Sequence, residues 1–390
     1  MSAPVIVSAV RTAIGTARKG TLANTSGEFL ASAILEEVVR RSGLDPQRFD
    51  DVLLAESQYG GGDLARYAAV VNGMLDVPGV ALNRHCAGSL TSIGLAAASV
   101  MSGMESALVA GGVQASSMAP RLRQRVAGTV DDYVDWYPAT HPDSPAAPNS
   151  DMSISVGWST AKAAGITREE QDAWAYRSHQ RAVAAIDAGK FTEEIVPLKF
   201  DGPNGTPVEF AVDEHPRRDT SLEKLASLKV LHPEISGFSI TAGNASGVND
   251  AAAAVTVTSA ELAAAEGLTP LAKVIAWGAA GVDPALMGFG GLRAADKVLE
   301  RAGRTYADVT LWEINEAFAS VPIAACKEFG LDEERVNFSG SGCSLGHPVA
   351  ASGARMIVTL VHELRRRGGG LGLATMCAGG GQGGAVLIEV

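Results

Sequence analysis

Two hydrophobic patterns alternate along the first part of the chain. Short, largely apolar runs typical of buried strands occupy residues 4–10, 51–54, 77–82 and 106–110. Small or apolar side chains at helical spacing occupy residues 28–41, 64–75 and 92–101. Because strands and helices alternate and the strands are almost wholly apolar, the pattern predicts an α/β fold with a covered, largely parallel sheet.

The pattern changes between Val113 and about Phe238. An aromatic and proline-rich stretch, residues 133–148, is typical of a long excursion over the surface. Further on, Thr167 and Glu170 have capping-box spacing and predict the start of a helix over residues 171–188. We interpret residues 113–238 as an inserted loop domain.

Strand and helix alternation resumes at Ser239. After Gly247 the sequence predicts an alanine-rich helix, and residues 272–277 read as a strand. Residues 80–112 and 335–381 also share an order of elements: a strand, a glycine-containing turn, a small-residue helix and a second strand. A duplicated unit would place the two turns across a shared interface, where pockets commonly lie.

These patterns divide the chain into three parts. Residues 1–112 together with about 239–268 form the first core half, and residues 269–390 form the second. The inserted domain is residues 113–238.

Composition narrows the class of protein. With 390 residues, 46% hydrophobic and 19% charged, the chain is long and apolar enough for two or more cores. The net charge of −11 argues against a general nucleic-acid binder. No apolar run approaches the length of a bilayer span and no secretory signal is apparent, so we expect a cytoplasmic protein without membrane contact. Four cysteines without paired spacing predict reduced thiols and no metal site.

Cys86 is the first candidate nucleophile. It lies in the predicted turn between the strand at 77–82 and the helix at 92–101. Free backbone N–H groups and the helix dipole at such a turn are expected to lower the pKa of a thiol. The alternative is a buried, inert cysteine.

Three later segments supply partners for this thiol. His347 lies in the turn equivalent to that of Cys86, and Asn315 follows the strand predicted at residues 309–312. Cys377 ends another strand and is followed by glycines, whose N–H groups can approach a substrate oxyanion closely. A thiol, an imidazole, an amide and a second thiol form a plausible set of nucleophile, base, polariser and acid.

The segments around Cys86, Asn315, His347 and Cys377 resemble those of thiolases, the acyl-CoA C-acetyltransferases. The run Ala242-Gly243-Asn244-Ala245-Ser246-Gly247 belongs to the same resemblance, which extends nearly from end to end. It implies two duplicated α/β core halves in a layered α-β-α-β-α sandwich, with the inserted loop domain, residues 113–238, binding CoA and substrate. It also implies self-association as a homodimer or homotetramer.

The resemblance implies a ping-pong reaction in two steps. His347 takes the proton of Cys86, whose thiolate attacks a 3-oxoacyl-CoA; acetyl-CoA leaves as an enolate that Cys377 protonates. Cys377 then deprotonates CoA, which collects the acyl group. Asn315, through a water, and His347 would form one oxyanion site, and the N–H groups of Cys86 and Gly379 the other.

By resemblance, coenzyme A is a substrate and no cofactor is bound permanently. Ser246 would lie along the pantetheine arm, with Met152 and Ala242 as further contacts. Arg217 would meet the nucleotide, since a guanidinium suits phosphate or adenine. The alternative for Arg217 is a solvated surface charge.

The chain departs from the thiolase pattern at three places. Asp151 stands where thiolases commonly have a histidine, residues 287–292 lack the expected prolines, and residues 339–344 add a thiol, Cys343, near the site. The chemistry should survive these changes, but the acyl pocket should differ. We therefore expect cleavage of 3-oxoacyl-CoA rather than synthesis of acetoacetyl-CoA.

Two other functions stay open at this point. A condensing enzyme of the ketoacyl-synthase type would share the nucleophile but normally pairs it with two histidines, and Cys377 and Asn315 disfavour it. A non-catalytic CoA-binding protein on the same fold is disfavoured because all four chemical residues are present.

Overall fold

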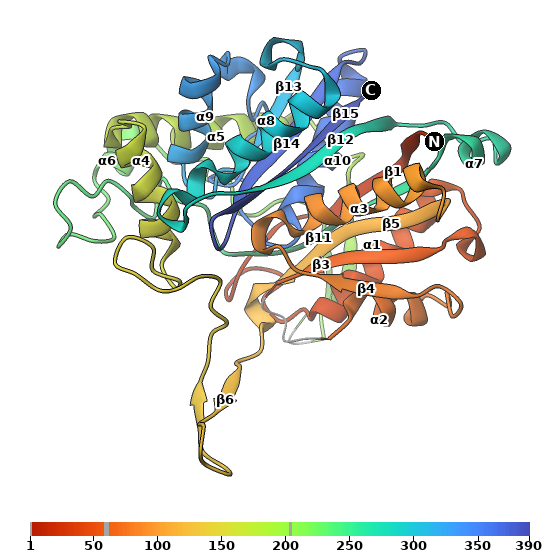
Figure 1. Ribbon diagram of the computed structural model, residues 1–390, viewed down its shortest axis with the longest axis horizontal. Helices are drawn as coiled ribbons and strands as arrows, with labels where there is room; N and C mark the ends of the chain where they lie inside the picture. Colours follow the sequence, from red (N-terminus) through yellow and green to blue (C-terminus); the bar gives the residue numbers. More distant parts are fainter. Residues whose placement is uncertain (1, 58–61, 203–204) are drawn as a thin grey trace.

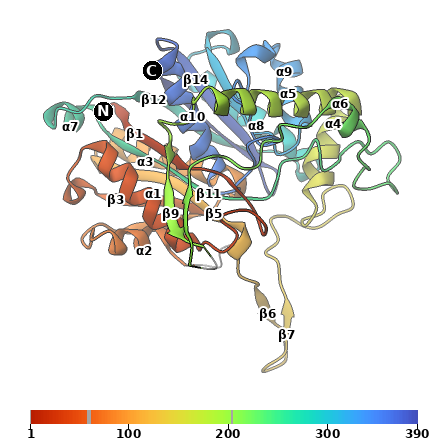
Figure 2. The same ribbon diagram turned by 180° about the vertical axis from the view of Figure 1, so that it is seen from behind.

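One mixed sheet runs through the computed structural model, which describes residues 2–57, 62–202 and 205–390 (Figures 1 and 2). Its strands lie in the order β13-β14-β15-β12-β1-β11-β5-β3-β4. Among the described strands, the two halves of this sheet pair where β1 meets β12, through Val5 with Lys273 and Ile6 with Ala272. The sheet is therefore two smaller sheets joined by a short seam.

The first half runs from β1 to the edge strand β4. It contains β1 (Pro4–Thr12), β11 (Asn249–Ser259), β5 (Ala107–Ala115), β3 (Asp51–Glu56) and β4 (Gly79–Leu82). The second half contains β12 (Ala272–Gly281), β15 (Gln382–Glu389), β14 (Leu371–Ala378) and β13 (Leu311–Ile314). The predicted largely parallel sheet is wrong. β3 pairs parallel with β4 and β5, and β13 with β14, but β1 with β11 and β12, β11 with β5, and β15 with β12 and β14 pair antiparallel.

Two helices lie between the halves: α3 (Gly88–Ser102) and α10 (Ser352–Arg366). Both pack against strands of each half, and their side chains fill a common core. On the outer faces, α1 (Gly27–Ser42) and α2 (Leu64–Val71) cover the first half, and α8 (Gly290–Ala302) covers the second. The predicted layering of helix, sheet, helix, sheet, helix is confirmed, because each layer buries one apolar face against the next.

The predicted alanine-rich helix after Gly247 is wrong. Residues 249–259 form β11, which lies between β1 and β5, and only the short α7 (Ala260–Ala265) follows it. All eleven residues of β11 are buried. A central strand is apolar on both sides and lacks the polar face of a surface helix, so burial overrides the helix propensity of alanine.

The inserted segment leaves the core after β5, which continues to Ala115. A hairpin of β6 (Arg123–Arg125) and β7 (Tyr133–Asp135) projects from the body (Figures 1 and 2). It is followed by a π-helix, η4 (Ser153–Trp158), α4 (Ser159–Ala163), α5 (Arg168–Asp187) and a second hairpin, β9 (Leu198–Asp201) with β10 (Pro207–Phe210). The capping box of Thr167 and Glu170 at the start of α5 is present as predicted.

A buried arginine fastens this segment to the core. Arg11 of β1 makes a bidentate pair with Asp213, at 2.7 and 2.8 Å, and a 2.7 Å pair with Glu194. All three side chains are fully buried. Removing one member would leave an uncompensated buried charge, so this contact holds the inserted segment firmly.

Candidate active site

Cys86, His347 and Cys377 line one cavity of about 240 Å³. The first follows β4, the second precedes α10 and the third lies in β14. The remaining lining residues are mostly apolar: Met152, Val156, Ser246, Gly247, Val248, Met287, Ala317, Phe318, Val349, Ala378 and Gly379. The structure thus brings together residues from both core halves and from the inserted segment.

Cys86 sits in a single turn of 3-10 helix, His85–Ala87, between β4 and α3. Backbone N–H groups of Cys86 and Gly379 interact with its sulfur and lower the pKa of the thiol. Burial is the larger effect and raises that pKa to about 11. The predicted low pKa is therefore wrong. The turn supplies its N–H groups, but they stabilise the thiolate less than its removal from water destabilises it.

His347 is buried and held by Asn249 and Ser352. Its backbone N–H donates to Oδ1 of Asn249 at 2.9 Å, and its Nδ1 lies 2.7 Å from the hydroxyl of Ser352. That hydroxyl donates its one proton to the carbonyl of Pro348 at 2.9 Å. It must then accept from Nδ1–H, which leaves a lone pair on Nε2.

The state of His347 at neutral pH follows from its surroundings. Burial, with a smaller effect from Arg355, lowers the pKa of the imidazole to about 3. A neutral imidazole with a free Nε2 is the form that can accept a proton. The geometry therefore prepares His347 as a base.

Asn315 lies beside this base. Its Nδ2 is 3.4 Å from Nε2 of His347, and its backbone N–H donates to Thr375 at 3.0 Å. Its Oδ1 is buried and has no partner among the described residues. The amide therefore has one atom directed to the base and one available for a further hydrogen bond.

Sequence reasoning missed the carboxylate next to Asn315. Glu316 accepts hydrogen bonds from four groups of distant elements: Trp174 Nε1 at 2.8 Å, Ser178 Oγ at 2.6 Å, Asn337 Nδ2 at 2.8 Å and the backbone N–H of Cys343 at 3.1 Å. This fully buried carboxylate thus has hydrogen-bond partners for both of its oxygens. The only signal in the sequence was a charged residue beside an apolar strand.

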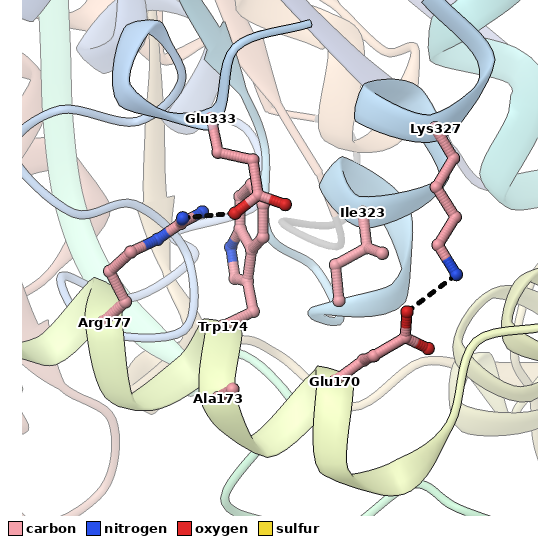
Figure 3. A pocket seen from close by; sticks show the side chains of 7 residues that line it. All are labelled: Glu170, Ala173, Trp174, Arg177, Ile323, Lys327 and Glu333. Atoms are coloured by element: carbon pink, nitrogen blue, oxygen red, sulfur yellow. Dashed lines mark hydrogen bonds and ion pairs between the residues drawn. The ribbon is translucent and has the colours of Figure 1, made fainter. Parts of the chain in front are cut away.

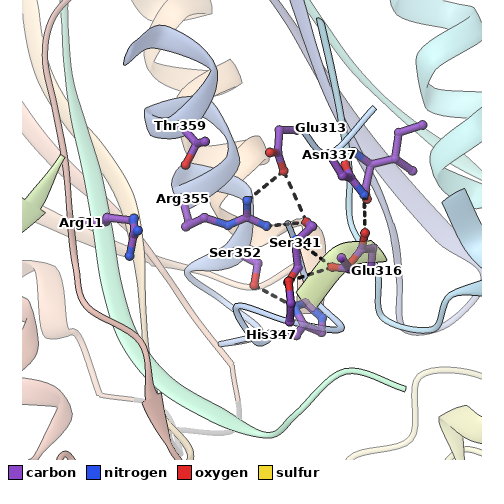
Figure 4. Close-up of polar contacts among 12 residues, drawn as sticks. Arg11, Glu313, Glu316, Asn337, Ser341, His347, Ser352, Arg355 and Thr359 are labelled. Atoms are coloured by element: carbon purple, nitrogen blue, oxygen red, sulfur yellow. Dashed lines mark hydrogen bonds and ion pairs between the residues drawn. The ribbon is translucent and has the colours of Figure 1, made fainter. Parts of the chain in front are cut away.

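A second buried pair lies behind His347 (Figure 4). Arg355 donates to Glu313 and to the hydroxyl of Ser341, both at 2.8 Å. Burial raises the pKa of Glu313 to about 7, although Arg355 opposes this shift. The pair connects α10 to β13 and so fixes the helix that follows the base.

Of the four predicted CoA contacts, two line the cavity and two lie outside its lining. Ser246 and Met152 line the cavity, whereas Ala242 is exposed and is not part of its lining. Arg217 is exposed, and its backbone N–H donates to Nδ1 of His179 at 3.1 Å. Two residues before it, the ring of His215 packs against Gly247, a lining residue.

Cys343 does not add a thiol to the cavity. It is buried behind the cavity, with Sγ 3.7 Å from the carbonyls of Asn244 and Glu316. The thiol therefore lies near the site, as expected, but it does not line the cavity. Of the other departures, Met287 does line the cavity, and Asp151 precedes the lining residue Met152.

Another hollow, of about 300 Å³, lies between α5 and α9 (Ser320–Phe329) (Figure 3). Two ion pairs flank it, Arg177 with Glu333 and Lys327 with Glu170. The guanidinium of Arg177 also stacks on Trp174 at 4.2 Å. Its charges are already paired and it holds no candidate nucleophile, so it does not compete with the cavity of Cys86.

Two features are absent from the described residues. No group of His, Cys, Asp and Glu side chains in these residues could hold a metal ion. None of the helices in the same residues has the length and apolar character needed to span a membrane.

Comparisons with known proteins agree along the whole chain. The family description "Thiolase, N-terminal domain" matches residues 4–261, and "Thiolase, C-terminal domain" matches residues 268–390. The chain is 41% identical to the acetyl-CoA acetyltransferase of Escherichia coli K12, covering 99% of this chain and 98% of that protein. It is 39% identical to the 3-oxoadipyl-CoA/3-oxo-5,6-dehydrosuberyl-CoA thiolase of the same organism, covering 98% of each.

A solved structure is similar as well. The crystal structure of the Bacillus anthracis acetyl-CoA acetyltransferase superposes with a TM-score of 0.91 at 40% sequence identity. The match covers 100% of this chain and 99% of the other.

Proposed function

The chain belongs to the thiolase family and is an acyltransferase that cleaves and forms 3-oxoacyl-CoA reversibly, and we propose that it works by a ping-pong mechanism through an acyl group on Cys86. One observation carries this proposal. Two thiols and a neutral imidazole, contributed by both core halves, line a single cavity. Each can reach the same small group of substrate atoms.

The first half-reaction uses Cys86 and His347. The thiol has a raised pKa and the imidazole a lowered one, so the pair is neutral at rest. Proton transfer to Nε2 therefore accompanies attack of sulfur on the 3-oxo carbon. The C2–C3 bond then breaks, its electron pair leaves with acetyl-CoA as an enolate, and Cys377 protonates C2.

The second half-reaction returns the enzyme to its starting state. The thiolate of Cys377 takes the proton of incoming CoA, and the CoA sulfur attacks the acyl carbon on Cys86. The sulfur of Cys86 leaves and recovers the proton held by His347. The backbone N–H groups of Cys86 and Gly379 would stabilise the oxyanion on one side, and His347, with a water held by Asn315, on the other.

The substrate we propose is a 3-oxoacyl-CoA cleaved with CoA, as in fatty acid β-oxidation. Similar proteins include acetyl-CoA acetyltransferases and a 3-oxoadipyl-CoA thiolase. The departure at Asp151 and the lining residue Met287 support an acyl pocket that differs from the usual thiolase pocket. Synthesis of acetoacetyl-CoA is the alternative.

For CoA we propose contacts with Ser246, Met152 and Ala242 along the pantetheine arm and Arg217 at the nucleotide. Arg217 is exposed on a loop that packs against the rim at Gly247, and an exposed guanidinium suits a phosphate. CoA acts as a substrate, and the scheme calls for no permanently bound cofactor.

We also propose a cytoplasmic homodimer or homotetramer. The strand β4 is an edge of the sheet, and large apolar side chains nearby are exposed: Tyr67, Val70, Val71, Leu75 and Val80. An edge strand beside exposed apolar residues is suited to pairing with a second copy. Size-exclusion chromatography with light scattering tests the assembly.

The test of the reaction is mass spectrometry of the protein incubated with a series of 3-oxoacyl-CoA substrates without CoA. We expect an acyl adduct on the Cys86 peptide and none on the peptide of Cys326, a buried thiol outside the cavity. Cys86→Ala should lose the adduct and at least about 10⁴-fold in turnover. An unmodified Cys86 peptide in protein that still turns over would refute the mechanism.

A further inference from the structure

A histidine bridges two carboxylates beside the cavity. Nε2 of His232 lies 2.8 Å from Oδ2 of Asp151, and Nδ1 lies 2.7 Å from Oε1 of Glu234. The ring also meets Phe238 edge to face, with centroids 5.0 Å apart. We call Asp151, His232 and Glu234 the His232 clamp.

The clamp requires a charged imidazole. Ionised carboxylates only accept hydrogen bonds, so both ring nitrogens must carry a proton to bond both of them. Glu234 and Asp151 accordingly raise the pKa of His232, although burial opposes them. Arg168 of α5 makes its hydrogen bonds elsewhere, to the carboxylate of Asp172 and to the backbone carbonyls of residues 225 and 228.

The clamp grips the π-helix that walls the cavity. The carboxylate of Asp151 accepts hydrogen bonds from the N–H and the hydroxyl of Ser153, the first residue of η4, at 2.9 and 2.6 Å. At the other end of η4, Trp158 packs on Phe238 with ring centroids 5.5 Å apart. One loop, residues 232–238, therefore holds both ends of a six-residue helix.

Two sides of this helix face hollows, although four of its six residues are buried. Its inner side contributes Val156 to the cavity, next to Met152 at its N-cap. Its outer side, with Ile154 and Trp158, faces a second hollow of about 510 Å³.

The middle of the helix is bonded to the body, by Ser155 to the carbonyl of Pro148 and by Ser320 to the carbonyl of Gly157. Because tight packing normally fixes a side chain, the side chains that face the hollows depend most on the contacts at the two ends of the helix.

We propose that the His232 clamp positions Met152 and Val156 in the wall of the catalytic cavity and so determines which acyl groups this thiolase accepts. The proposal rests on the proposed function, since it assigns part of the specificity of that same cavity. Asp151, His232 and Glu234 are positioning residues: they act through the helix they hold and do not touch the reacting atoms.

The experiment compares two substrates, acetoacetyl-CoA and 3-oxooctanoyl-CoA, in wild type and in three variants. His232→Asn breaks the bridge, Asp151→Asn keeps the cap on Ser153 but removes the charge, and Glu234→Gln alters an exposed partner. We expect the ratio of the two kcat/KM values to change about tenfold in the first two. The change should reside in KM, with kcat for acetoacetyl-CoA within about twofold.

The protonated bridge predicts a pH dependence as well. The wild-type ratio should drift toward that of His232→Asn as pH rises through the raised pKa of His232, because one of the two bonds is then lost. Because both substrates react at the same two thiols, the effect of thiol titration on kcat/KM cancels in the ratio. In His232→Asn the ratio should not change with pH.

The matched control is Glu37→Gln. Glu37 also joins two opposite charges, Arg40 and Arg41, but on α1 and far from the lining residues. It should leave the ratio unchanged. Asp151→Asn combined with His232→Asn should be no worse than either alone, since both break one bridge.

A ratio that stays within twofold of wild type in every clamp variant overturns the proposal, as does a change that appears only in kcat. Glu234 is exposed, so Glu234→Gln can still test the proposal if the other two variants fold poorly. Failure of the proposed function itself would look different: wild type would form no acyl adduct on Cys86 with either substrate.

Discussion

The two turns that carry the reactive groups are built on the same plan but fastened in different ways. In each, the residue just before the reactive one has a positive φ: His85, at 46°, before Cys86, and Gly346, at 107°, before His347. In each, the chain then enters one of the two central helices. Cys86 is met by backbone N–H groups, whereas His347 is held by side chains.

The difference reflects what each group needs. A thiol that becomes an anion needs only donors, and a backbone turn supplies them. An imidazole acting as a base needs one chosen tautomer, which only a placed acceptor such as Ser352 can impose. The Cys86 turn should therefore tolerate side-chain changes that the His347 turn does not, and the following predictions test this asymmetry.

The largest expected effect is the pH dependence of thiol reactivity. Because burial raises the pKa of Cys86 to about 11, the thiolate fraction should grow tenfold per pH unit below that value. Alkylation by iodoacetamide should thus accelerate about a thousandfold from about pH 7 to about pH 10, against about thirtyfold for an unperturbed thiol. Quantifying the modified Cys86 peptide measures this rate. A plateau near pH 8.5 would mean that the N–H groups outweigh burial after all.

Next in size is Gly346→Ala. A Cβ at Gly346 would stand 2.4 Å from Oδ1 of Asn249, and the φ of 107° is strained for alanine. The turn must shift and carry His347 with it, so we expect kcat/KM to fall about 100-fold, as for a misplacement of about 1 Å. Stability should fall by about 1–3 kcal/mol. Steady-state kinetics and thermal unfolding measure both.

Gly368→Ala provides the control for the glycine change itself. Gly368 has a φ of 88° but no atom within 4 Å of its Cβ position. It should lose stability without a comparable loss of kcat/KM. If the two variants lose equal activity, the contact with Asn249 does not position the base.

The sequence was informative where the signal is local. The turn of Cys86, the capping box at Thr167 and the alternation of strands and helices in the first part of the chain could be predicted from neighbouring residues, whereas the layering was implied only by the resemblance to thiolases. The contacts of His347 with Asn249 and of Glu316 with Trp174 join residues about 100 and 140 positions apart. No local pattern encodes such contacts, and the same holds for the burial that raises the pKa of Cys86.

β11 shows the same limit for the fold. Its run of alanines has high helix propensity, and only its place between β1 and β5 makes it a strand. Ser352 was missed because a serine near a helix start usually serves as a cap, whereas here it orients the imidazole of His347.

Ser352→Ala should have a smaller effect than Gly346→Ala. It removes the acceptor of Nδ1–H without moving the backbone, leaving a buried donor unpaired at about 1–3 kcal/mol. We expect kcat to fall about tenfold with KM little changed, since the interaction serves proton transfer. Ser352→Thr keeps the hydroxyl and should retain more activity than Ser352→Ala. Equal loss in both would show that packing, not the hydrogen bond, matters.

The smallest effect is expected from His85→Gly, the counterpart of Gly346→Ala in the other turn. Glycine adopts the φ of 46° readily, which relieves about 1 kcal/mol, but it also increases the entropy of the unfolded chain by a similar amount. The contact of the His85 ring with Gly379 is lost, yet the N–H groups that meet Cys86 remain. We therefore expect unfolding free energy to change by less than about 1 kcal/mol and kcat/KM by less than about threefold.

His85→Val separates the backbone from the ring in this test. A β-branched residue fits a positive φ poorly, so this variant should lose about 1–2 kcal/mol of stability while also lacking the imidazole. Comparing the two by thermal unfolding and kinetics isolates the conformational cost. A loss of activity in His85→Gly as large as that in Gly346→Ala would show that the Cys86 turn also depends on a side chain, and the asymmetry between the two turns would not hold.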